Sequence, residues 1–192
     1  MAVNARTSRV LLVLGAFLSG LLVFFLVILM VTGRSPSPVG RAVAAVGGPF
    51  ELVDQNDKPL TDRDMKGRPF LVFFGFTHCP DVCPTTLALL ASVQKQAAIP
   101  GLRIALITVD PERDTPQQLG SYIASFRGDL IGLTGSPPEI VKAAQGFGVA
   151  FERVELAGGN YTMDHSAAVF MLDSQARIVA IFTPPLSAGA DT

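Results

Sequence analysis

The chain has few of the residues from which metal and redox sites are built: its 192 residues include two cysteines, two histidines and no tryptophan. A structural zinc site normally takes four protein ligands, so it would use every cysteine and histidine of the chain, which disfavours such a site. Charged residues make up only 16% and hydrophobic ones 49%, with a mean hydropathy of +0.43. This composition excludes a disordered chain and is more hydrophobic than an ordinary soluble domain. The length fits one domain with an appendage.

Acidic residues are missing from the N-terminal part, where the first one is Glu51. Four of the 15 basic residues and none of the 16 acidic ones precede it, so the rest of the chain carries a net charge of about −5 and the whole chain −1. Proteins that bind nucleic-acid backbones need a basic surface instead. Nucleic-acid partners are therefore excluded.

A hydrophobic stretch of 22 uncharged residues occupies positions 10–31. As a helix it would be roughly 33 Å long, which is enough to cross a bilayer. It exceeds the apolar region of a cleaved signal peptide, although small residues at 42–44 leave cleavage open. Arginines flank both sides, so the positive-inside rule only weakly favours one orientation.

Glycine, proline, serine and alanine dominate the next segment, residues 32–49, which is a composition typical of a flexible linker. No internal repeat follows. We therefore expect a short cytoplasmic N-terminus (1–9), a transmembrane anchor (10–31), the linker (32–49) and one globular domain (50–192).

The globular part begins with alternating buried strands and helices and ends with a hairpin. The predicted strands are 69–75, 103–109, 130–133, 149–154, 167–172 and 177–182, and the predicted helices are 85–98, 116–126 and 138–147. A parallel βαβ half followed by an antiparallel hairpin is typical of an α/β, thioredoxin-like domain, with a central mixed sheet flanked by helices. Only ten residues follow Phe182, and they include two prolines, so we expect a final helix to be missing or very short.

Both cysteines, Cys79 and Cys83, lie between a predicted buried strand and the start of a helix. In a first helical turn they would share one face, and the free N–H groups there would lower thiol pKa values, an effect that Asp81 opposes. The pair is suited to disulfide formation or to binding a soft metal. A structural disulfide is an alternative in an oxidising compartment, whereas two unrelated core cysteines fit poorly beside Pro80 and Pro84.

The histidines decide between these possibilities. His165 precedes the predicted hairpin, and in a thioredoxin-like sheet this loop adjoins the cysteine turn. Two thiolates and one imidazole form a ligand set that copper accepts as Cu(I) or Cu(II). The alternative for a single histidine is a hydrogen-bonded core residue. His78 is adjacent to Cys79 and would point the other way, so we expect a supporting role for it.

Further polar residues lie close to these positions. Asp110, Glu112 and Asp114 form an acidic turn that we expect to cap the next helix, with orientation of a partner protein as an alternative. Asp164 is expected to orient the His165 imidazole. The glycine pairs at 47–48 and 158–159 match no phosphate-binding loop and are assigned to linker and turn.

Three motifs resemble one known family: FTHCPDVCPTT at 76–86, TVDPERDTP at 108–116 and YTMDHSAAVFMLD at 161–173. Together they are similar to the SCO/SenC family of copper-binding, thioredoxin-like assembly proteins for cytochrome c oxidase, over about residues 50–182. The resemblance implies that Cys79, Cys83 and His165 bind copper and that the cysteines cycle between dithiol and disulfide. It also implies a single-pass protein of the inner membrane, with its domain in the periplasm, or in the intermembrane space if mitochondrial. Family members usually continue into a C-terminal helix, which this sequence lacks room for.

The leading hypothesis is a copper chaperone that delivers one copper per chain, through Cys79, Cys83 and His165, to subunit II of cytochrome c oxidase or a related respiratory oxidase. Other copper chaperones or thiol reductases would also be partners. The alternative is a thiol-disulfide oxidoreductase that reduces the cysteines of the oxidase copper site, with Cys79 attacking and Cys83 resolving. Peroxide reduction is a weaker variant, and a copper or redox sensor is a third possibility.

Overall fold

The computed structural model describes residues 14–26, 47–97 and 99–184 and divides into two compact units, Met1–Ala42 and Val43–Thr192. In the first unit, residues 14–26 are helical. The rest of the predicted span 10–31 and the linker up to residue 46 lie outside the described residues. Within the described ranges, no helix combines the length and the hydropathy needed to cross a membrane.

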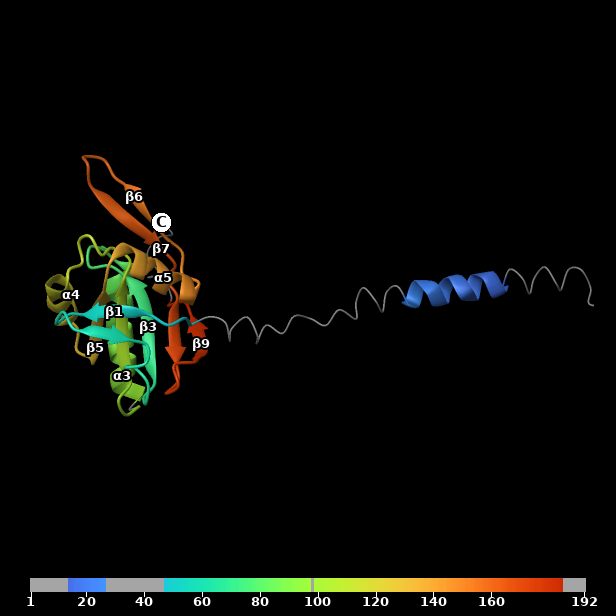
Figure 1. Cartoon of the computed structure of the whole chain (residues 1–192), viewed down its shortest axis with the longest axis horizontal. Coiled ribbons are helices and arrows are strands. Elements are labelled where there is room, and N and C mark those ends of the chain that lie inside the picture. The colour runs from blue at the N-terminus through green and yellow to red at the C-terminus, as the bar shows by residue number, and fades with distance from the viewer. Residues whose placement is uncertain (1–13, 27–46, 98, 185–192) are drawn as a thin grey trace, which may run out of the picture. The chain divides into compact units, whose positions relative to one another are not determined.

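The second unit is built on a mixed sheet, which Figure 1 shows with its helices. Its strands are β1 (Glu51–Asp54), β2 (Pro59–Thr61), β3 (Phe70–Gly75), β4 (Arg103–Thr108), β5 (Leu130–Thr134), β8 (Val169–Leu172) and β9 (Ile178–Phe182). They form one seven-stranded sheet in the order β2-β1-β5-β4-β3-β8-β9. The central strands β3, β4 and β5 are parallel, and the outer ones pair antiparallel.

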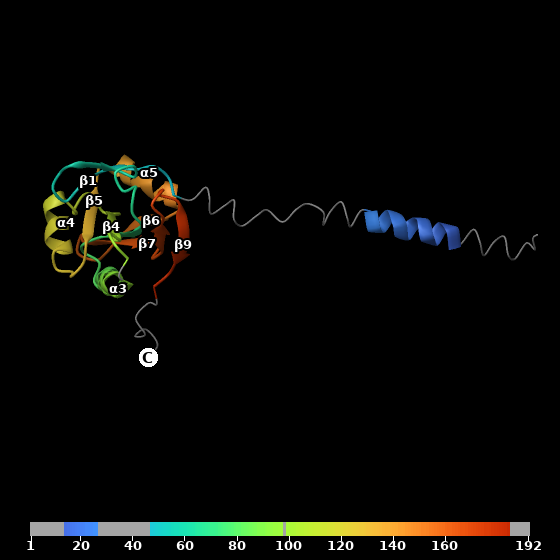
Figure 2. The same ribbon diagram turned by 90° about the horizontal axis from the view of Figure 1, so that it is seen from below.

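Three helices cover this sheet: α3 (Val82–Ala97), α4 (Pro116–Ile123) and α5 (Pro137–Phe147). The view in Figure 2 shows α3 and α5 on opposite faces of the sheet, and α4 packs against β5. This arrangement confirms the predicted thioredoxin-like α/β architecture. It also explains why β3 is a continuous apolar run, because a strand covered on both faces has no solvent side.

The side chains of β3 alternate between the two faces of the sheet. Phe74 packs against Phe147 of α5 and Phe170 of β8, with ring centroids 5.5 and 6.4 Å apart. Phe73 points to the other face, where its ring lies 6.1 Å from that of His165. Both phenylalanines are fully buried. The central strand therefore contributes to the core on one face and to the site region on the other.

Some parts of the fold differ from the prediction. The strands β1 and β2 were not predicted, and α3 begins at Val82, three residues before the expected start. The earlier start is possible because Pro84 falls in the first turn, where its missing N–H costs nothing. Helix α4 ends at Ile123 rather than at the predicted 126.

A second sheet consists of the hairpin β6 (Phe151–Glu155) and β7 (Tyr161–His165), which projects from the rest of the unit (Figure 1). Phe151 pairs with His165 in its register. Gly158 and Gly159 have φ values of 83° and 77° and make the predicted turn. The extended segment predicted at 149–154 is thus confirmed as β6, whereas its partner β7 was missed. His165 is the last residue of β7 and not part of a loop.

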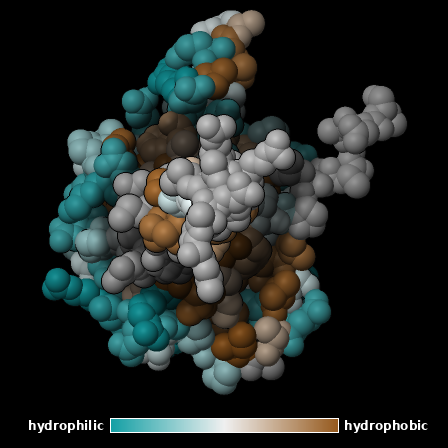
Figure 3. Space-filling model, turned by 90° about the vertical axis from the view of Figure 1, so that its right-hand side faces the viewer, coloured by the Kyte–Doolittle hydropathy of each residue, from teal (hydrophilic) through white to brown (hydrophobic). Residues whose placement is uncertain are grey.

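The edge strand β9 leaves Val179, Ile181 and Phe182 exposed. Hydrophobic surface is visible on the side of the molecule that Figure 3 turns toward the reader. The residues after Pro184, on which the predicted short or missing final helix falls, lie outside the described residues.

The start of this unit is held against α5. Gly47 and Gly48, which we assigned to the linker, both donate backbone N–H groups to the carbonyl of Gly146, at 2.8 and 3.1 Å. A Cβ atom on Gly48 would lie 2.9 Å from the Gly146 Cα. The contact therefore requires glycine at both 48 and 146.

Candidate metal centre

The two cysteines lie at the junction of β3 and α3. Cys83 is the second residue of α3 and fully buried, whereas Cys79 precedes the helix and is half-buried. The backbone N–H of Cys83 donates to the Cys79 sulfur at 3.4 Å. A Cβ on Gly75 would approach the Cys83 sulfur to 3.0 Å, so the glycine at the end of β3 makes room for it. The helix N-terminus thus acts on Cys79 through a backbone N–H that has no partner within the helix. Neither cysteine forms a disulfide within the described residues.

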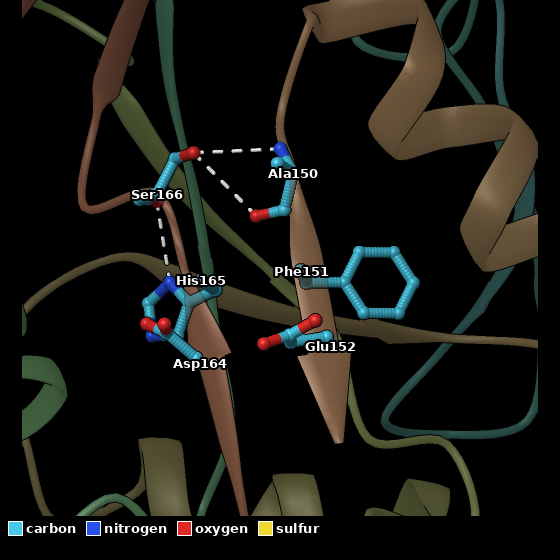
Figure 4. Close-up of a pocket in the computed structure, with 6 residues that line it drawn as sticks. All are labelled: Ala150, Phe151, Glu152, Asp164, His165 and Ser166. Carbon is cyan, nitrogen blue, oxygen red and sulfur yellow. Dashed lines mark hydrogen bonds between the residues drawn. The ribbon is translucent and has the colours of Figure 1, made fainter. Parts of the chain in front are cut away.

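His165 faces this pair from the end of β7. Its Nε2 atom lies 3.5 Å from the Cys83 sulfur, and its Nδ1 atom lies 3.2 Å from the carbonyl oxygen of Ser166 (Figure 4). A carbonyl can only accept, so the Ser166 oxygen holds the Nδ1 side of the ring and leaves Nε2 directed at Cys83. The rings of Phe73 and Phe76 pack edge-on against the imidazole, with centroids 6.1 and 5.9 Å away. The imidazole is therefore held with Nε2, a nitrogen that can bind a metal, on the side of the thiols.

The sequence suggested Asp164 for the orienting role that the Ser166 carbonyl performs. Asp164 is exposed and pairs across the hairpin with Glu152. Successive residues of a strand point to opposite faces, which takes the Asp164 carboxylate away from the imidazole. Both carboxylates line a hollow of about 320 Å³ on one side of His165 (Figure 4). Solvent therefore reaches this side of the site.

The thiols of the pair have opposite pKa shifts. The hydrogen bond from the Cys83 thiol lowers the pKa of Cys79 to about 4, against the opposing effect of burial, and His165 and the backbone N–H groups of Cys83 and Asp81 add to the lowering. Donating that hydrogen bond, together with burial, raises the pKa of Cys83. Asp81 thus acts on Cys79 through its N–H, in the direction opposite to the effect expected from its charge. The site holds one thiolate and one thiol.

The first prediction concerns alkylation of Cys79. We expect the pH–rate profile with iodoacetamide, measured by mass spectrometry, to have its midpoint well below pH 7, because the thiolate persists until the pH falls through the lowered pKa. Replacing Cys83 by serine weakens the hydrogen bond and should move the midpoint upward. A wild-type midpoint near the ordinary cysteine value of about 8.5 would contradict the prediction.

A neighbouring group of side chains is the one set of His, Cys, Asp and Glu donors, within the described part of the chain, whose atoms all lie within 4.8 Å of one another: His78, Asp110 and Asp114. The three predicted copper ligands are adjacent but less tightly grouped. The buried Asp114 carboxylate already accepts the N–H and hydroxyl of Thr77, at 3.0 and 2.6 Å, and the hydroxyl of Thr108, at 2.6 Å. Because three hydrogen bonds already use most of the acceptor capacity of this carboxylate, we interpret the group as a hydrogen-bond network. His78 is exposed at its edge, 3.8 Å from Asp114, which agrees with a supporting role.

The acidic turn does not cap the next helix, as we had expected. The N-cap of α4 is Thr115, whose hydroxyl accepts the N–H of Gln118 at 3.2 Å. Asp110 instead contacts Tyr161 of the hairpin that carries His165, and Asp114 contacts Thr77 of the segment that carries the cysteines. Glu112 forms an ion pair at 3.1 Å with Arg153 of the hairpin. The capping prediction failed because a threonine directly precedes the helix and supplies the side-chain acceptor first.

Comparison with known proteins agrees with this geometry. The sequence model of the SCO1/SenC family matches residues 39–190. The chain is 39% identical over 142 residues to the mitochondrial SCO1 homolog 1 of Arabidopsis thaliana, a match that covers 72% of this chain and 42% of that one. The chain thus spans less than half of the length of this relative.

Solved structures give the same result. The structure of Bradyrhizobium japonicum ScoI with copper bound is 45% identical, with a TM-score of 0.69, and the match covers 72% of this chain and 90% of that one. BsSco, a member of the Sco family of cytochrome c oxidase assembly proteins in which a disulfide switch was identified, is 26% identical with a TM-score of 0.57, over 72% of this chain and 83% of that one. The chain therefore belongs to the SCO1/SenC family.

Proposed function

We propose that the chain binds one copper ion as cargo, through Cys79, Cys83 and His165, and delivers it to subunit II of cytochrome c oxidase or to a related respiratory oxidase. The observation that carries the proposal is the Nε2 atom of His165, which lies 3.5 Å from the Cys83 sulfur. The copper-bound structure of the Bradyrhizobium relative supports the choice of metal. The function of BsSco's family in oxidase assembly supports the choice of partner.

The donor set fits copper chemically. Thiolates favour Cu(I), and an imidazole extends the set to Cu(II). The lowered pKa of Cys79 supplies one thiolate without cost near neutral pH, whereas Cys83 must release its proton when the metal binds. Three protein ligands leave a position open for an incoming thiol, so the cargo can pass to an acceptor by ligand exchange.

The same proposal includes a place in the cell. Residues 10–31 would anchor the chain in the inner membrane and 32–49 would tether the domain, which would lie in the periplasm, or in the intermembrane space if mitochondrial. The mitochondrial Arabidopsis relative supports a respiratory membrane. Copper chaperones that load the site and reductases that keep its thiols reduced are the further partners.

The asymmetry of the two cysteines favours thiol-disulfide exchange as a second function. The Cys79 thiolate would attack a sulfur of the partner's disulfide, forming a mixed disulfide as the partner's other sulfur leaves as a thiolate. That thiolate takes up the proton that Cys83 gives up. Cys83 then attacks the Cys79 sulfur, which closes the Cys79–Cys83 disulfide and releases the second partner thiolate. Two electrons pass to the partner, and the disulfide switch of BsSco supports this chemistry.

The two functions are separated by anaerobic copper titration of the reduced full-length chain, kept in detergent, beside His165→Ala. We expect wild type to retain one copper per chain, and the variant to lose its Cu(II)–imidazole signal in electron paramagnetic resonance and at least about 10-fold in Cu(II) affinity. His78→Ala replaces the other histidine of the chain and leaves the three proposed ligands in place, so it should keep the Cu(II)–imidazole signal that His165→Ala loses. Equal binding by wild type and His165→Ala would reject the ligand assignment. A wild type that holds no copper but exchanges readily with a disulfide substrate would be a reductase.

A further inference from the structure

Tyr161, the first residue of β7, is held more firmly than an exposed hairpin requires. Its ring is sandwiched between two guanidinium groups, with the Cζ atoms of Arg113 and Arg153 3.7 and 3.6 Å from the ring centroid. Its hydroxyl donates to Asp110 at 2.9 Å. Cation–π contacts on both ring faces and a charge-assisted hydrogen bond act on one side chain.

Two of the three groups that hold Tyr161, Asp110 and Arg113, come from the loop between β4 and α4, residues 109–115, whereas Arg153 lies on β6. Arg113 donates through Nε to Asp110 and through a terminal nitrogen to the Tyr161 carbonyl, at 3.1 Å. Glu112 adds the ion pair with Arg153. The loop thus binds the carbonyl and the hydroxyl of Tyr161 and, through Glu112, its neighbour Arg153. Asp110 and Tyr161 are nevertheless 51 positions apart in the sequence.

The same loop also holds the cysteine segment. Asp114 accepts the N–H and the hydroxyl of Thr77, two residues before Cys79. One five-residue turn, Asp110 to Asp114, is therefore bonded at one end to the hairpin that carries His165 and at the other to the segment that carries the thiols. β7 is a single strand of five residues, so displacement of Tyr161 is transmitted along it to His165.

We propose that residues 110–114 set the distance between the thiol pair and the imidazole, with Tyr161 as the positioning residue for His165. Tyr161 acts through the strand and touches no donor atom of the site. The inference rests on the proposed copper binding. It also explains why the three sequence motifs meet at this place: 76–86 contributes the thiols, 161–173 the imidazole, and 108–116 the turn that joins them.

Tyr161→Phe tests the proposal, because it removes the hydroxyl and leaves the ring between the guanidiniums. Tyr122→Phe is the matched control, since the chain has two tyrosines and the hydroxyl of Tyr122 is buried with no hydrogen-bond partner among the residues that the structure describes. In the full-length chain we expect Tyr161→Phe to change the nitrogen hyperfine signal of bound Cu(II) and to lower Cu(II) affinity about 10-fold, as loss of an outer-shell contact does. Affinity for Cu(I), which the thiolates hold, should change less, and Tyr122→Phe should match wild type.

A second measurement uses the metal-free chain. We expect backbone amides of 161–165 to exchange hydrogen faster in Tyr161→Phe and in Asp110→Asn than in Tyr122→Phe. Faster exchange with an unchanged Cu(II) signal would reduce Tyr161 to a structural role and overturn the inference, as would unchanged exchange. If wild type and His165→Ala bind copper equally, the proposed copper function fails, and the exchange rates then decide by themselves whether the turn holds the hairpin.

Discussion

The chain with Cys83 replaced by serine is expected to bind copper at least about 100-fold more weakly than wild type, since loss of outer-shell partners alone costs about 10- to 100-fold. Serine offers a hard hydroxyl in place of a soft thiolate, and Cys83 is the donor that contacts both Cys79 and His165. Competition with a chelator of known affinity under anaerobic conditions measures the loss.

Serine is nearly isosteric with cysteine, so the variant should keep its fold, which thermal unfolding would verify. The His78→Ala chain again provides a control for nonspecific loss of metal. A folded Cys83→Ser chain that retains wild-type affinity for Cu(I) would show that the buried sulfur is not a ligand.

Asp114→Ala should lower the free energy of unfolding by about 3 kcal/mol, because it leaves three buried donors without an acceptor. These donors are the N–H and hydroxyl of Thr77 and the hydroxyl of Thr108. Urea unfolding followed by circular dichroism measures the change. Because the segment that carries the cysteines loses the hydrogen bonds from Thr77 to Asp114, the alkylation rate of Cys79 should also change.

Asp62→Ala is a matched control for this substitution, since Asp62 is only half-buried and its carboxylate forms no hydrogen bond or ion pair within the described part of the chain. Asp114→Asn, which keeps an acceptor oxygen, should fall between alanine and wild type. A loss below about 1 kcal/mol for Asp114→Ala would mean that water replaces the carboxylate in this network.

Local patterns were sufficient for the central sheet and for the cysteines. The run from Phe70 to Gly75 is hydrophobic because both of its faces are covered, and such a run can be recognised without knowing its neighbours. Pro84 marks the start of a helix in the same way, although α3 begins at Val82, before the predicted start, so that Cys83 but not Cys79 lies in its first turn. These features depend on residues close together in the sequence.

The rest of the site depends on contacts that leave little trace in the sequence. The imidazole of His165 is oriented by a backbone carbonyl, that of Ser166, which any residue would provide. The strand β7 was missed because none of its side chains is fully buried and its hydrophobic pattern is therefore weak, although Gly158 and Gly159 mark a hairpin turn before it. The hydrogen bond from Tyr161 to Asp110 joins residues 51 positions apart, so only the folded structure reveals it.

The tyrosine held between two guanidinium groups also provides an optical signal. The chain has no tryptophan and two tyrosines, so its intrinsic fluorescence comes from Tyr122 and Tyr161 alone. In the Tyr122→Phe chain a single phenol, bonded to the Asp110 carboxylate, is left to emit. The brightness of that one ring would report, without any attached dye, whether the hairpin stays in place while copper enters and leaves.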